Sequence, residues 1–324
     1  QQLPRLFLEF LAVLGLVALV LLMLWEGKPL DTLLPTLGLF AAAAFRLIPS
    51  INRILNAVQG LRFALPMLEL LNNELSFLDS ENTEARPHRC EFMTEFRLEK
   101  VSFQYPSSEN LALVDVSFTI PSGASVGFIG ESGAGKTTIV DIILGLITPD
   151  KGVVEVDGVN IQNNLRGWQD QIGYVPQTIF LTDDTLRRNI AFGLPNEQID
   201  DARISRALKL AQLERFVKGL PEGLETMVGE FGVRLSGGQR QRIGIARALY
   251  HDPEVLVLDE ATSSLDTKTE REVMDAVREL KGSKTLIIIA HRLSTVEKCD
   301  YLFKIEQGVL VDQGEATVVL SGRR

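Results

Sequence analysis

Apolar residues dominate the first part of the chain in two long runs, residues 6–25 and residues 30–48. Glu9 is the only charged residue in the first run. An α-helix rises 1.5 Å per residue, so about 20 residues span the roughly 30 Å hydrocarbon core of a bilayer. The short polar stretch between the runs contains Gly27 and Pro29, which favour a turn. The pattern therefore predicts an all-α helical hairpin that crosses a membrane.

The charges beside the two runs indicate an orientation. Arg5 precedes the first run and Arg46, Arg53 and Arg62 accompany the end of the second, whereas the turn carries Lys28 alone among basic residues. The positive-inside rule places both ends of the hairpin in the cytoplasm. A signal peptide has a shorter apolar core, and the long uncharged run disfavours a buried hairpin of a soluble protein. We expect an integral membrane protein of the bacterial inner or plasma membrane type.

Beyond residue 50 the apolar positions recur every three or four residues as far as Leu75, which predicts an amphipathic helix that extends the second run. Pro49 and Pro66 are the expected kink sites. We therefore assign residues 1–75 to a membrane domain. Residues 76–95 are polar and contain Pro87, so we expect a linker there.

From residue 96 onward, short apolar runs alternate with helical patterns, which predicts an α/β fold with buried parallel strands. The expected strands include residues 96–105, 116–120, 125–129, 255–258 and 285–290. The formal net charge of the chain is −9, and the whole negative excess lies after residue 70. That balance argues against nucleic acid as a partner, because nucleic-acid binding relies on a basic surface.

A phosphate-binding loop follows the strand at 125–129 and precedes a helical stretch at 139–146. Its residues are Gly130, Glu131, Ser132, Gly133, Ala134, Gly135, Lys136, Thr137 and Thr138, which match G-x-x-x-x-G-K-[ST]. Glycines let backbone N–H groups ring the phosphates, Lys136 supplies a positive charge, and the Thr137 hydroxyl suits Mg²⁺. The helix N-terminus adds a favourable dipole for the anion. The spacing predicts a P-loop NTPase that binds ATP and Mg²⁺.

Two acidic residues, Asp259 and Glu260, end the apolar run at 255–258. The carboxyl edge of a parallel strand is where doubly wound sheets hold ligands. We expect Asp259 to hold Mg²⁺ through water, and Glu260 to orient or deprotonate the attacking water.

A second candidate phosphate site is the segment Leu235-Ser236-Gly237-Gly238-Gln239. Ser236 is a good N-cap for a helix at 237–250, and the two glycines expose backbone N–H groups at its positive end. The two phosphate-binding helix ends lie about 100 residues apart in sequence. One nucleotide need not use both ends from the same chain.

On these motifs, residues 96–324 resemble the nucleotide-binding domain of ABC transporters. The resemblance implies a RecA-like core and a helical subdomain at about 178–250. It implies that Tyr105 stacks on adenine, that Gln177 contacts Mg²⁺ and reports to the membrane domain, and that His291 contacts the γ-phosphate. Asp266 ends a segment, with Ser263 and Ser264, that resembles the loop crossing the dimer interface, although Ser264 stands where many members have Ala. Glu230 resembles an acidic contact of exporters, and Phe231 departs from the usual basic residue beside it.

The resemblance also implies a head-to-tail dimer. ATP bound at Lys136 of one chain is expected to be closed over by residues 235–239 of the other. Because the catalytic positions are intact, we expect a homodimer, with a heterodimer containing a degenerate partner as the alternative. The membrane helices run into the ATPase in one polypeptide, as in exporters, whose half-transporters have six spans. We therefore expect this chain to be the C-terminal part of a longer half-transporter.

Three segments suggest a substrate. Residues 41–75, with 45–53 as the most telling part, and residues 168–177 and 181–193 resemble segments of lipid-linked oligosaccharide flippases (PglK type). Arg46 and Arg53 could contact a lipid pyrophosphate, although positive-inside anchoring explains each of them more simply. A multidrug, peptide or lipid A exporter is the alternative, because the ATPase motifs are shared. A soluble mechanical ABC ATPase acting on nucleic acid or ribosomes is a weaker alternative.

Overall fold

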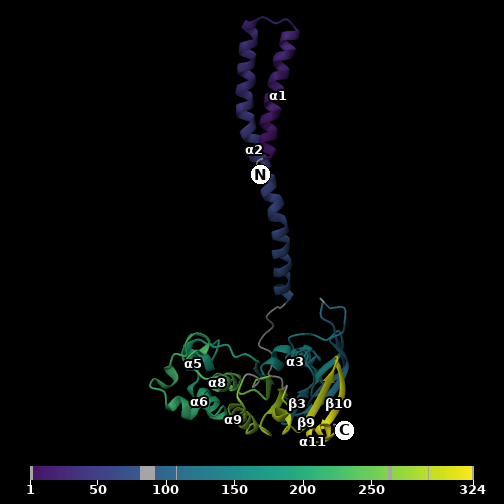
Figure 1. Ribbon diagram of the computed structural model, residues 1–324, viewed down its shortest axis with the longest axis vertical. Helices are drawn as coiled ribbons and strands as arrows, with labels where there is room; N and C mark the ends of the chain where they lie inside the picture. Colours follow the sequence, from purple (N-terminus) through teal and green to yellow (C-terminus); the bar gives the residue numbers. More distant parts are fainter. Residues whose placement is uncertain (1–2, 81–91, 107, 262–264, 291, 323–324) are drawn as a thin grey trace. The chain divides into compact units, whose positions relative to one another are not determined.

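The computed structural model describes residues 3–80, 92–106, 108–261, 265–290 and 292–322. The chain divides into two compact units, Gln1–Ala85 and Arg86–Arg324 (Figure 1).

The first unit is a helical hairpin of α1 (Leu3–Trp25) and α2 (Leu30–Ser80). The helices lie side by side over the length of α1 (Figure 1), and Gly15 lets the Phe40 ring approach α1 closely. Met23 and Leu33 are buried, whereas large apolar side chains such as Phe10 and Phe45 are exposed. Outward-facing apolar side chains are what a helix surrounded by lipid requires.

Both helices of the hairpin have apolar composition of the membrane type. Residues Leu33–Asn72 form a stretch long and apolar enough to cross a membrane, with a mean hydropathy of 1.5, and residues Phe10–Trp25 form a shorter apolar helix. The helix continues through Pro35, Pro49 and Pro66. It also reaches Ser80, so the expectation of a linker from residue 76 is wrong for residues 76–80. The reason is that these five residues include no glycine or proline to end the helix. Residues 81–91 of that linker lie outside the described part.

The second unit contains two sheets. A four-stranded antiparallel sheet has the order β2-β1-β4-β5. Its strands are β1 (Glu95–Phe103), β2 (Leu113–Pro121), β4 (Lys151–Val156) and β5 (Val159–Asn160). A six-stranded sheet has the order β10-β9-β3-β8-β7-β6. Its strands are β3 (Ser125–Ile129), β6 (Ile172–Val175), β7 (Val255–Asp259), β8 (Thr285–Ile289), β9 (Tyr301–Glu306) and β10 (Val309–Glu315).

The larger sheet is parallel except for its edge strand β10. Phe128 of β3 pairs with Ile289 of β8, and Leu258 of β7 pairs with Val175 of β6. The carboxyl ends of these strands therefore meet at one edge, where a doubly wound fold holds its ligand. This register brings the loop after β3 and the acids after β7 to the same edge.

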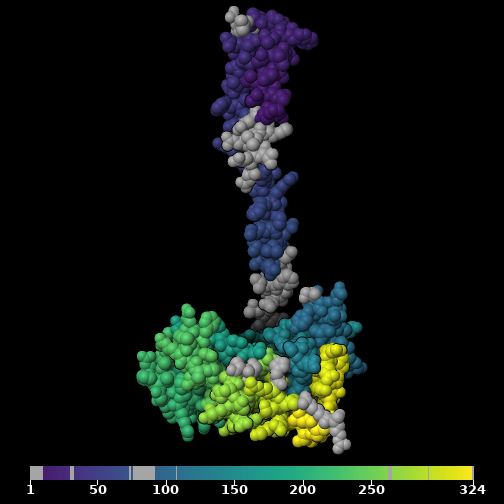
Figure 2. Space-filling view, in the orientation of Figure 1, coloured from purple at the N-terminus to yellow at the C-terminus, as the bar shows by residue number. Residues whose placement is uncertain are grey.

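Helices cover the sheets and build a separate lobe. Those around the sheets are α3 (Lys136–Ile143), α4 (Leu165–Gln169), α9 (Thr267–Arg278), α10 (Leu293–Val296) and α11 (Ala316–Ser321). Those of the lobe are α5 (Leu186–Ile190), α6 (Asp201–Leu210), α7 (Glu214–Lys218) and α8 (Gly237–Leu249). The lobe is green in Figure 2 and bulges beside the rest of the unit. Helix α8 also packs against β6 and α9, which joins the lobe to the core.

Two predicted boundaries are displaced for identifiable reasons. The helix expected at 139–146 begins at Lys136 and ends at Ile143, because Gly145 adopts a left-handed conformation with φ +67°. The first strand ends at Phe103 rather than at Tyr105. There the backbone N–H of Gln104 donates to the Asp150 carboxylate at 2.8 Å instead of to a neighbouring strand.

The core between the sheets is rich in aromatic residues. The Trp168 ring stacks on Phe96 with the centroids 5.2 Å apart, and its indole N–H donates to the Ile143 carbonyl at 2.7 Å. That carbonyl lies at the end of α3, so Trp168 satisfies a group that the helix itself leaves without a partner. The contact fixes the helix that carries Lys136 and Thr137 against the smaller sheet.

Candidate nucleotide-binding site

The loop after β3 is shaped by a close approach of two backbones. Gly130 has φ +154°, and a side chain there would bring its Cβ to 2.2 Å from the Ile305 carbonyl oxygen. Only glycine fits such a position. The chain can therefore leave β3 sharply and turn back toward the N-terminus of α3.

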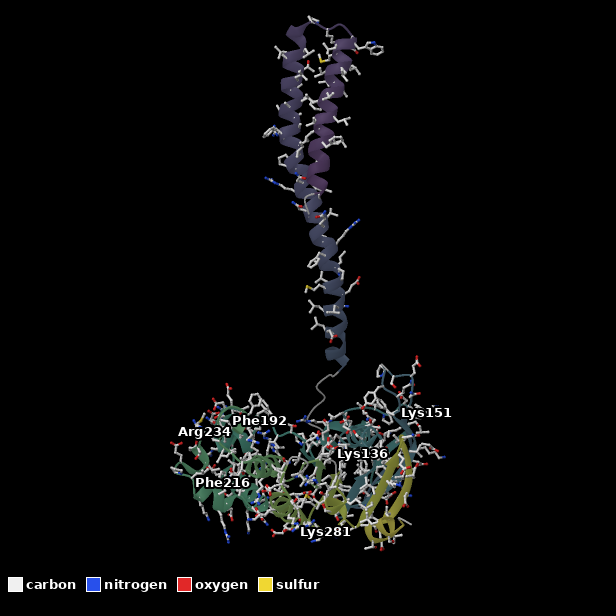
Figure 3. The ribbon with its side chains drawn as sticks, viewed as in Figure 1. Lys136, Lys151, Phe192, Phe216, Arg234 and Lys281 are labelled. Atoms are coloured by element: carbon white, nitrogen blue, oxygen red, sulfur yellow. The ribbon has the colours of Figure 1, made fainter. Side chains whose placement is uncertain are left out.

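Lys136, labelled in Figure 3, is the first residue of α3, where this loop ends. Its Nζ donates to the carbonyl oxygens of Gly130 at 2.9 Å and Glu131 at 2.8 Å. Burial lowers the pKa of Lys136, while the negative charges of Glu260 and Asp259 oppose that change. The ammonium group is thus held by its own loop, close to the two acidic residues that follow β7.

A cavity of about 630 Å³ opens over the loop, within the size range of small-molecule sites. The predicted site residues in its lining are Tyr105, Ser132, Gly133, Gly135, Lys136, Thr137, Thr138 and Glu260. Three other predicted residues, Gly130, Glu131 and Ala134, are absent from this lining and contribute backbone carbonyls to the loop structure. The structure therefore brings most of the predicted nucleotide-binding residues to one cavity.

Tyr105 forms a wall of the cavity. Its hydroxyl shares a hydrogen bond of 3.2 Å with the Thr138 Oγ1, and its ring meets Phe103 edge-on with the centroids 5.0 Å apart. The ring is partly exposed. An aromatic ring fixed at one edge and open on a face can stack against a base.

The cavity also contains residues that the sequence analysis missed, namely Asn110, Leu111, Ala112, Gln307 and Gly308. Gly308 lies in the turn between β9 and β10 with φ +79°. Its N–H donates to the Ala134 carbonyl at 2.9 Å, and its carbonyl accepts from the Val114 N–H at 2.9 Å. This turn therefore braces the phosphate loop against β2. A glycine between two apolar runs indicates a hairpin, but not where the hairpin packs.

The acidic edge is held by residues from β6 and the segment after it. The Gln177 amide Nε2 donates to Glu260 Oε2 at 2.8 Å, and the Tyr174 hydroxyl donates to Asp259 Oδ2 at 3.2 Å. Glu260 itself has φ +48°, an uncommon conformation for a residue with a side chain. Three predicted residues, Gln177, Asp259 and Glu260, thus form one cluster.

Tyr174 and Asp141 belong to the same cluster and were not predicted. Burial and the Asp259 charge raise the pKa of Tyr174 to about 12. Burial and, as the smaller cause, the negative charge of Asp259 raise the pKa of Asp141. Perturbed groups gathered in a cleft are typical of functional sites. Tyr174 lies three residues before Gln177, but its sequence context alone did not separate it from an ordinary strand tyrosine.

The donor set at this edge suits a hard cation. Thr137, Gln177 and Asp259 supply a hydroxyl, an amide and a carboxylate oxygen, which are ligands of the kind that Mg²⁺ accepts alongside phosphate oxygens and water. No group of three or more His, Cys, Asp or Glu side chains within metal-binding reach occurs among the residues described. A metal held by these three side chains would have its other positions open to phosphate oxygens and water.

The segment from Leu235 to Gln239 begins α8. Ser236 Oγ accepts from the Gln239 N–H at 3.3 Å, and Gln239 Oε1 accepts from the Ser236 N–H at 2.8 Å, which forms a capping box. Gly238 permits close contact with α9, because a Cβ there would lie 2.2 Å from Thr269 Cγ2. None of residues 235–239, all of them described, lines the cavity over the phosphate loop.

Asp266 caps α9 in the same manner. Its carboxylate accepts from the Thr269 hydroxyl at 2.6 Å and from the N–H groups of Lys268 and Thr269, and these bonds lower the pKa of Asp266. Within this chain, Asp266 therefore lies apart from the cavity and serves as an N-cap. The predicted residues Ser263, Ser264 and His291 lie outside the described residues.

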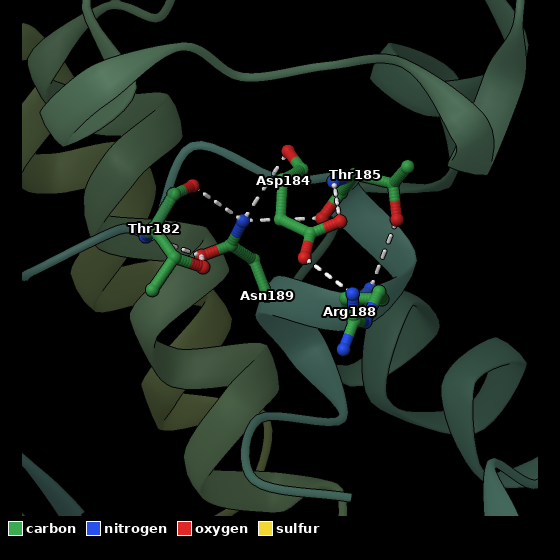
Figure 4. Close-up of polar contacts among 5 residues, drawn as sticks. All are labelled: Thr182, Asp184, Thr185, Arg188 and Asn189. Atoms are coloured by element: carbon green, nitrogen blue, oxygen red, sulfur yellow. Dashed lines mark hydrogen bonds and ion pairs between the residues drawn. The ribbon is translucent and has the colours of Figure 1, made fainter. Parts of the chain in front are cut away.

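Between Gln177 and α8, a buried polar network fixes the lobe. Figure 4 shows the Asn189 side chain between Thr182, Asp184 and Thr185. Its Oδ1 accepts from the Thr182 N–H at 3.0 Å, and its Nδ2 donates to the carbonyls of Thr182 at 3.0 Å and Thr185 at 3.1 Å. Arg247 of α8 donates to the Asn189 carbonyl and to the Phe180 carbonyl, both at 2.8 Å. The segment after Gln177 is thereby tied to the helix that carries Gly237 and Gly238.

Glu230 and Phe231 lie in a short 3₁₀ turn before α8, Glu230–Gly232. Phe231 has φ +52° and is exposed, and its ring meets the Phe180 ring edge-on at 5.3 Å. The acidic contact expected of Glu230 stays a prediction.

Comparison with known proteins agrees with this geometry. Residues 113–263 match the ABC transporter family model. An ATP-dependent lipid A-core flippase of Photobacterium profundum is 34% identical over 315 residues, which cover 97% of this chain and 54% of that protein. A protein of the same name from Cupriavidus metallidurans is 38% identical over 308 residues, 94% of this chain and 52% of its own length. The chain thus spans about half the length of these curated relatives.

A solved structure is similar over almost the whole chain. The structure of a bacterial Atm1-family ABC exporter with ATP bound matches with a TM-score of 0.67 and 28% identity, covering 99% of this chain and 57% of that one. The phosphate loop, the acidic strand end and the mixed sheets together define a P-loop ATPase domain of the ABC type. Residues 113–263 therefore belong to the ATPase domain of the ABC transporter family. Over most of its length the chain is similar to exporters of that family.

Proposed function

We propose that the protein to which this chain belongs is an ATP-driven exporter that moves a lipid-anchored saccharide across a membrane. Residues 1–80, which include the whole of α2, would belong to its membrane domain, 81–95 to a linker, and 96–324 to a cytoplasmic ATPase domain with a helical subdomain at about 178–250. The observation that carries the proposal is the cavity in which Lys136, Thr137 and Glu260 meet. A phosphate-binding loop faces a carboxylate there, as ATP hydrolysis requires.

In this proposal Lys136 and the loop N–H groups hold the phosphates, and Tyr105 stacks on adenine. Thr137, Gln177 and Asp259 would hold Mg²⁺, which neutralises phosphate charge when bound. Glu260 orients the attacking water or takes its proton, and His291 contacts the γ-phosphate. The Gln177–Glu260 hydrogen bond of 2.8 Å supports this role for Gln177, because its amide already touches the proposed base.

A second chain completes the site. Residues 235–239 do not reach the cavity of their own chain, but the N-terminus of α8 is suited to an anion. In a head-to-tail homodimer, residues 235–239 and Asp266 of one protomer would close over ATP bound to the other. ATP would then favour the closed dimer and hydrolysis would release it, which is a population switch. A heterodimer with a degenerate partner is the alternative assembly.

The substrate class rests on two kinds of support. Relatives covering most of this chain are named lipid A-core flippases, and segments 45–53, 168–177 and 181–193 resemble lipid-linked oligosaccharide flippases. Both kinds of substrate are saccharides carried on a lipid. Arg46 and Arg53 lie seven residues apart on α2 and so share one helix face, where they could pair with phosphate or anchor the helix at the cytoplasmic surface.

The test uses the full-length protein in proteoliposomes with labelled lipid-linked oligosaccharide in one set and labelled lipid A-core in another. We expect ATP to move one of these substrates between leaflets, and Glu260→Gln to abolish the movement while ATP still binds. Lys136→Ala should instead weaken ATP binding. An active ATPase that moves neither lipid would refute the substrate class and direct attention to drugs and peptides. Near-parental hydrolysis by Glu260→Gln would refute the role of Glu260.

A further inference from the structure

A tyrosine outside the phosphate loop supports the acid that ends β7. Tyr174 belongs to β6, and its hydroxyl donates to Asp259 Oδ2 at 3.2 Å. In the register of the two parallel strands Tyr174 pairs with Val257, two residues before Asp259. Among the described residues the hydroxyl makes no other hydrogen bond. Because a carboxylate can only accept, the phenol is the donor, and β6 thereby fixes one oxygen of Asp259.

The segment that carries Tyr174 also holds the neighbouring acid. Gln177, three residues further along, donates from Nε2 to Glu260 Oε2 at 2.8 Å. Tyr174 and the segment after β6 thus give one donor to each of two adjacent carboxylates. Glu260 lines the nucleotide cavity, whereas Tyr174 lies outside that lining. Tyr174 can therefore influence a ligand in the cavity only through the acid that it holds.

A third carboxyl group makes such a support useful. Asp141 follows Thr137 by one turn of α3, which places both residues on one face of that helix. Burial and then the negative charge of Asp259 raise the pKa of Asp141, so the two carboxyl groups lie close enough to interact. Like charges repel each other. A hydrogen bond from β6 opposes any rotation of the Asp259 carboxylate away from Asp141.

We propose that Tyr174 is a positioning residue for the cation that accompanies ATP: its hydroxyl holds the Asp259 carboxylate in the orientation in which it receives Mg²⁺ together with Thr137. The proposal rests on the ATP and Mg²⁺ site proposed above. Tyr174 then sets the affinity for the complex of the cation with ATP. The affinity for nucleotide without the cation is left to Lys136 and the phosphate loop.

The size of the effect follows from the general behaviour of metal sites. Residues that hydrogen-bond a metal ligand orient it, and loss of one such residue lowers metal affinity about 10–100-fold. The Tyr174–Asp259 bond of 3.2 Å is long for a hydroxyl donor. We therefore expect a loss near the lower end of that range.

Two conservative variants provide the test. Tyr174→Phe removes the hydroxyl and keeps the ring. Tyr301→Phe is the matched control, because Tyr301 is a tyrosine of β9 in the same sheet and is 38% exposed, as Tyr174 is. Tyr301 also lies outside the lining of the nucleotide cavity.

The full-length proteins are compared by the Kd for a non-hydrolysable ATP analogue, measured once with excess Mg²⁺ and once in EDTA. Tyr174→Phe should raise the Kd in Mg²⁺ about tenfold and leave the Kd in EDTA at the parental value. Tyr301→Phe should match the parent in both conditions. In an Asp259→Ala background, Tyr174→Phe should change the Kd in Mg²⁺ by less than about twofold, since no carboxylate is left to position.

Parental values in Tyr174→Phe would overturn the proposal. An equal rise in both Kd values would also overturn it, because the hydroxyl would then support the site as a whole. A full tenfold effect in the Asp259→Ala background would exclude action through Asp259. Lys136-dependent hydrolysis by the parent upholds the ATPase of the proposed function whatever Tyr174 does. A parent whose affinity for the analogue does not rise with Mg²⁺ would remove this inference together with the Mg²⁺ site.

Discussion

The buried amide of Asn189 offers a direct test of how the helical lobe is held together. Asn189 is fully buried in α5. Four of its side-chain hydrogen bonds have fixed partners, namely the Thr182 N–H, the Thr182 carbonyl, the Thr185 carbonyl and an Arg247 Nη2 at 3.2 Å. A fifth comes from the Thr182 hydroxyl at 3.2 Å, which can rotate to another partner, and a sixth, to the Asp184 carbonyl, is long at 3.5 Å. Asn189→Ala removes all four and leaves their partners buried.

The expected cost follows from these bonds. A hydrogen bond within a protein contributes about 1 kcal/mol net, so four of them amount to about 4 kcal/mol. Alanine is a better helix former than asparagine by about 0.5 kcal/mol or slightly more. Arg247 limits the loss, because it keeps its bonds to two backbone carbonyls at 2.8 Å. We therefore expect the segment of residues 180–192 to lose about 3 kcal/mol of local stability.

Amide hydrogen exchange measured by mass spectrometry reports this local stability directly. A loss of about 3 kcal/mol should speed exchange in peptides covering residues 180–192 by roughly 100-fold. Asn196→Ala is the control, because Asn196 is an exposed asparagine of the same lobe. Exchange in Asn189→Ala that stays within about threefold of the parent would show that the network does not hold this segment, and the reasoning from bond counts would be wrong.

Two further predictions concern the core of the ATPase domain. Gly308→Ala should lower the free energy of unfolding by about 2–4 kcal/mol in denaturant titrations, since the new Cβ would meet the Ala112 carbonyl oxygen at 2.5 Å with φ at +79°. Gly282→Ala, at a similar φ of +83° but in open space, should lower the free energy of unfolding by only about 1 kcal/mol. Equal losses in the two variants would contradict the role of the Ala112 carbonyl. Burial alone would raise the pKa of Asp157, but backbone N–H donors at 2.7–2.9 Å outweigh it and lower that pKa below its usual 3.8. The ionised Asp157 carboxylate therefore stabilises the fold above pH 3.8, and this stabilisation is lost as the pH falls through the lowered pKa. The difference in melting temperature between the parent and Asp157→Asn should narrow as the pH is lowered below 3.8. A difference that stays constant would contradict this prediction.

Much of the ATPase core could be predicted because its signals are local. The strand at 125–129 was predicted with the bounds that the structure has, since five apolar or small residues bounded by turn residues suit a buried strand. The hairpin of α1 and α2 followed from the length of its apolar runs. The helix boundaries at residues 80, 136 and 143 differ from the predicted ones. The end at residue 143 depends on Gly145, and the end at residue 80 on the absence of glycine or proline before it. Hydrophobic periodicity detects neither.

The parts of the site that the sequence did not reveal are those that depend on long-range packing. Gly308 reaches the phosphate loop only because β9 pairs with β3 and places the β9–β10 turn beside Ala134. Tyr174 reaches Asp259 only because β6 and β7 are neighbours in the sheet. Neither residue belongs to a sequence motif, because glycine is common in turns and tyrosine is common in strands. Such partners are found from sheet order and register, which local sequence does not encode.

The hydrogen bonds of Lys136 and of two helix caps indicate how the ATPase domain is kept ready for its ligand. Lys136 donates to two carbonyls of its own loop, and Ser236 and Asp266 satisfy N–H groups of the helices that they begin. These three groups, which are expected to contact ATP, are therefore occupied within the single chain. An incoming phosphate can replace the Lys136 bonds with stronger charge-assisted ones. The Ser236 cap is long at 3.3 Å, whereas the Thr269–Asp266 bond is 2.6 Å. The Ser236 Oγ accepts in its cap and can still donate its O–H to a phosphate, whereas the Asp266 carboxylate is an acceptor that a phosphate would repel. In the proposed dimer, Asp266 would therefore act chiefly through the position of α9.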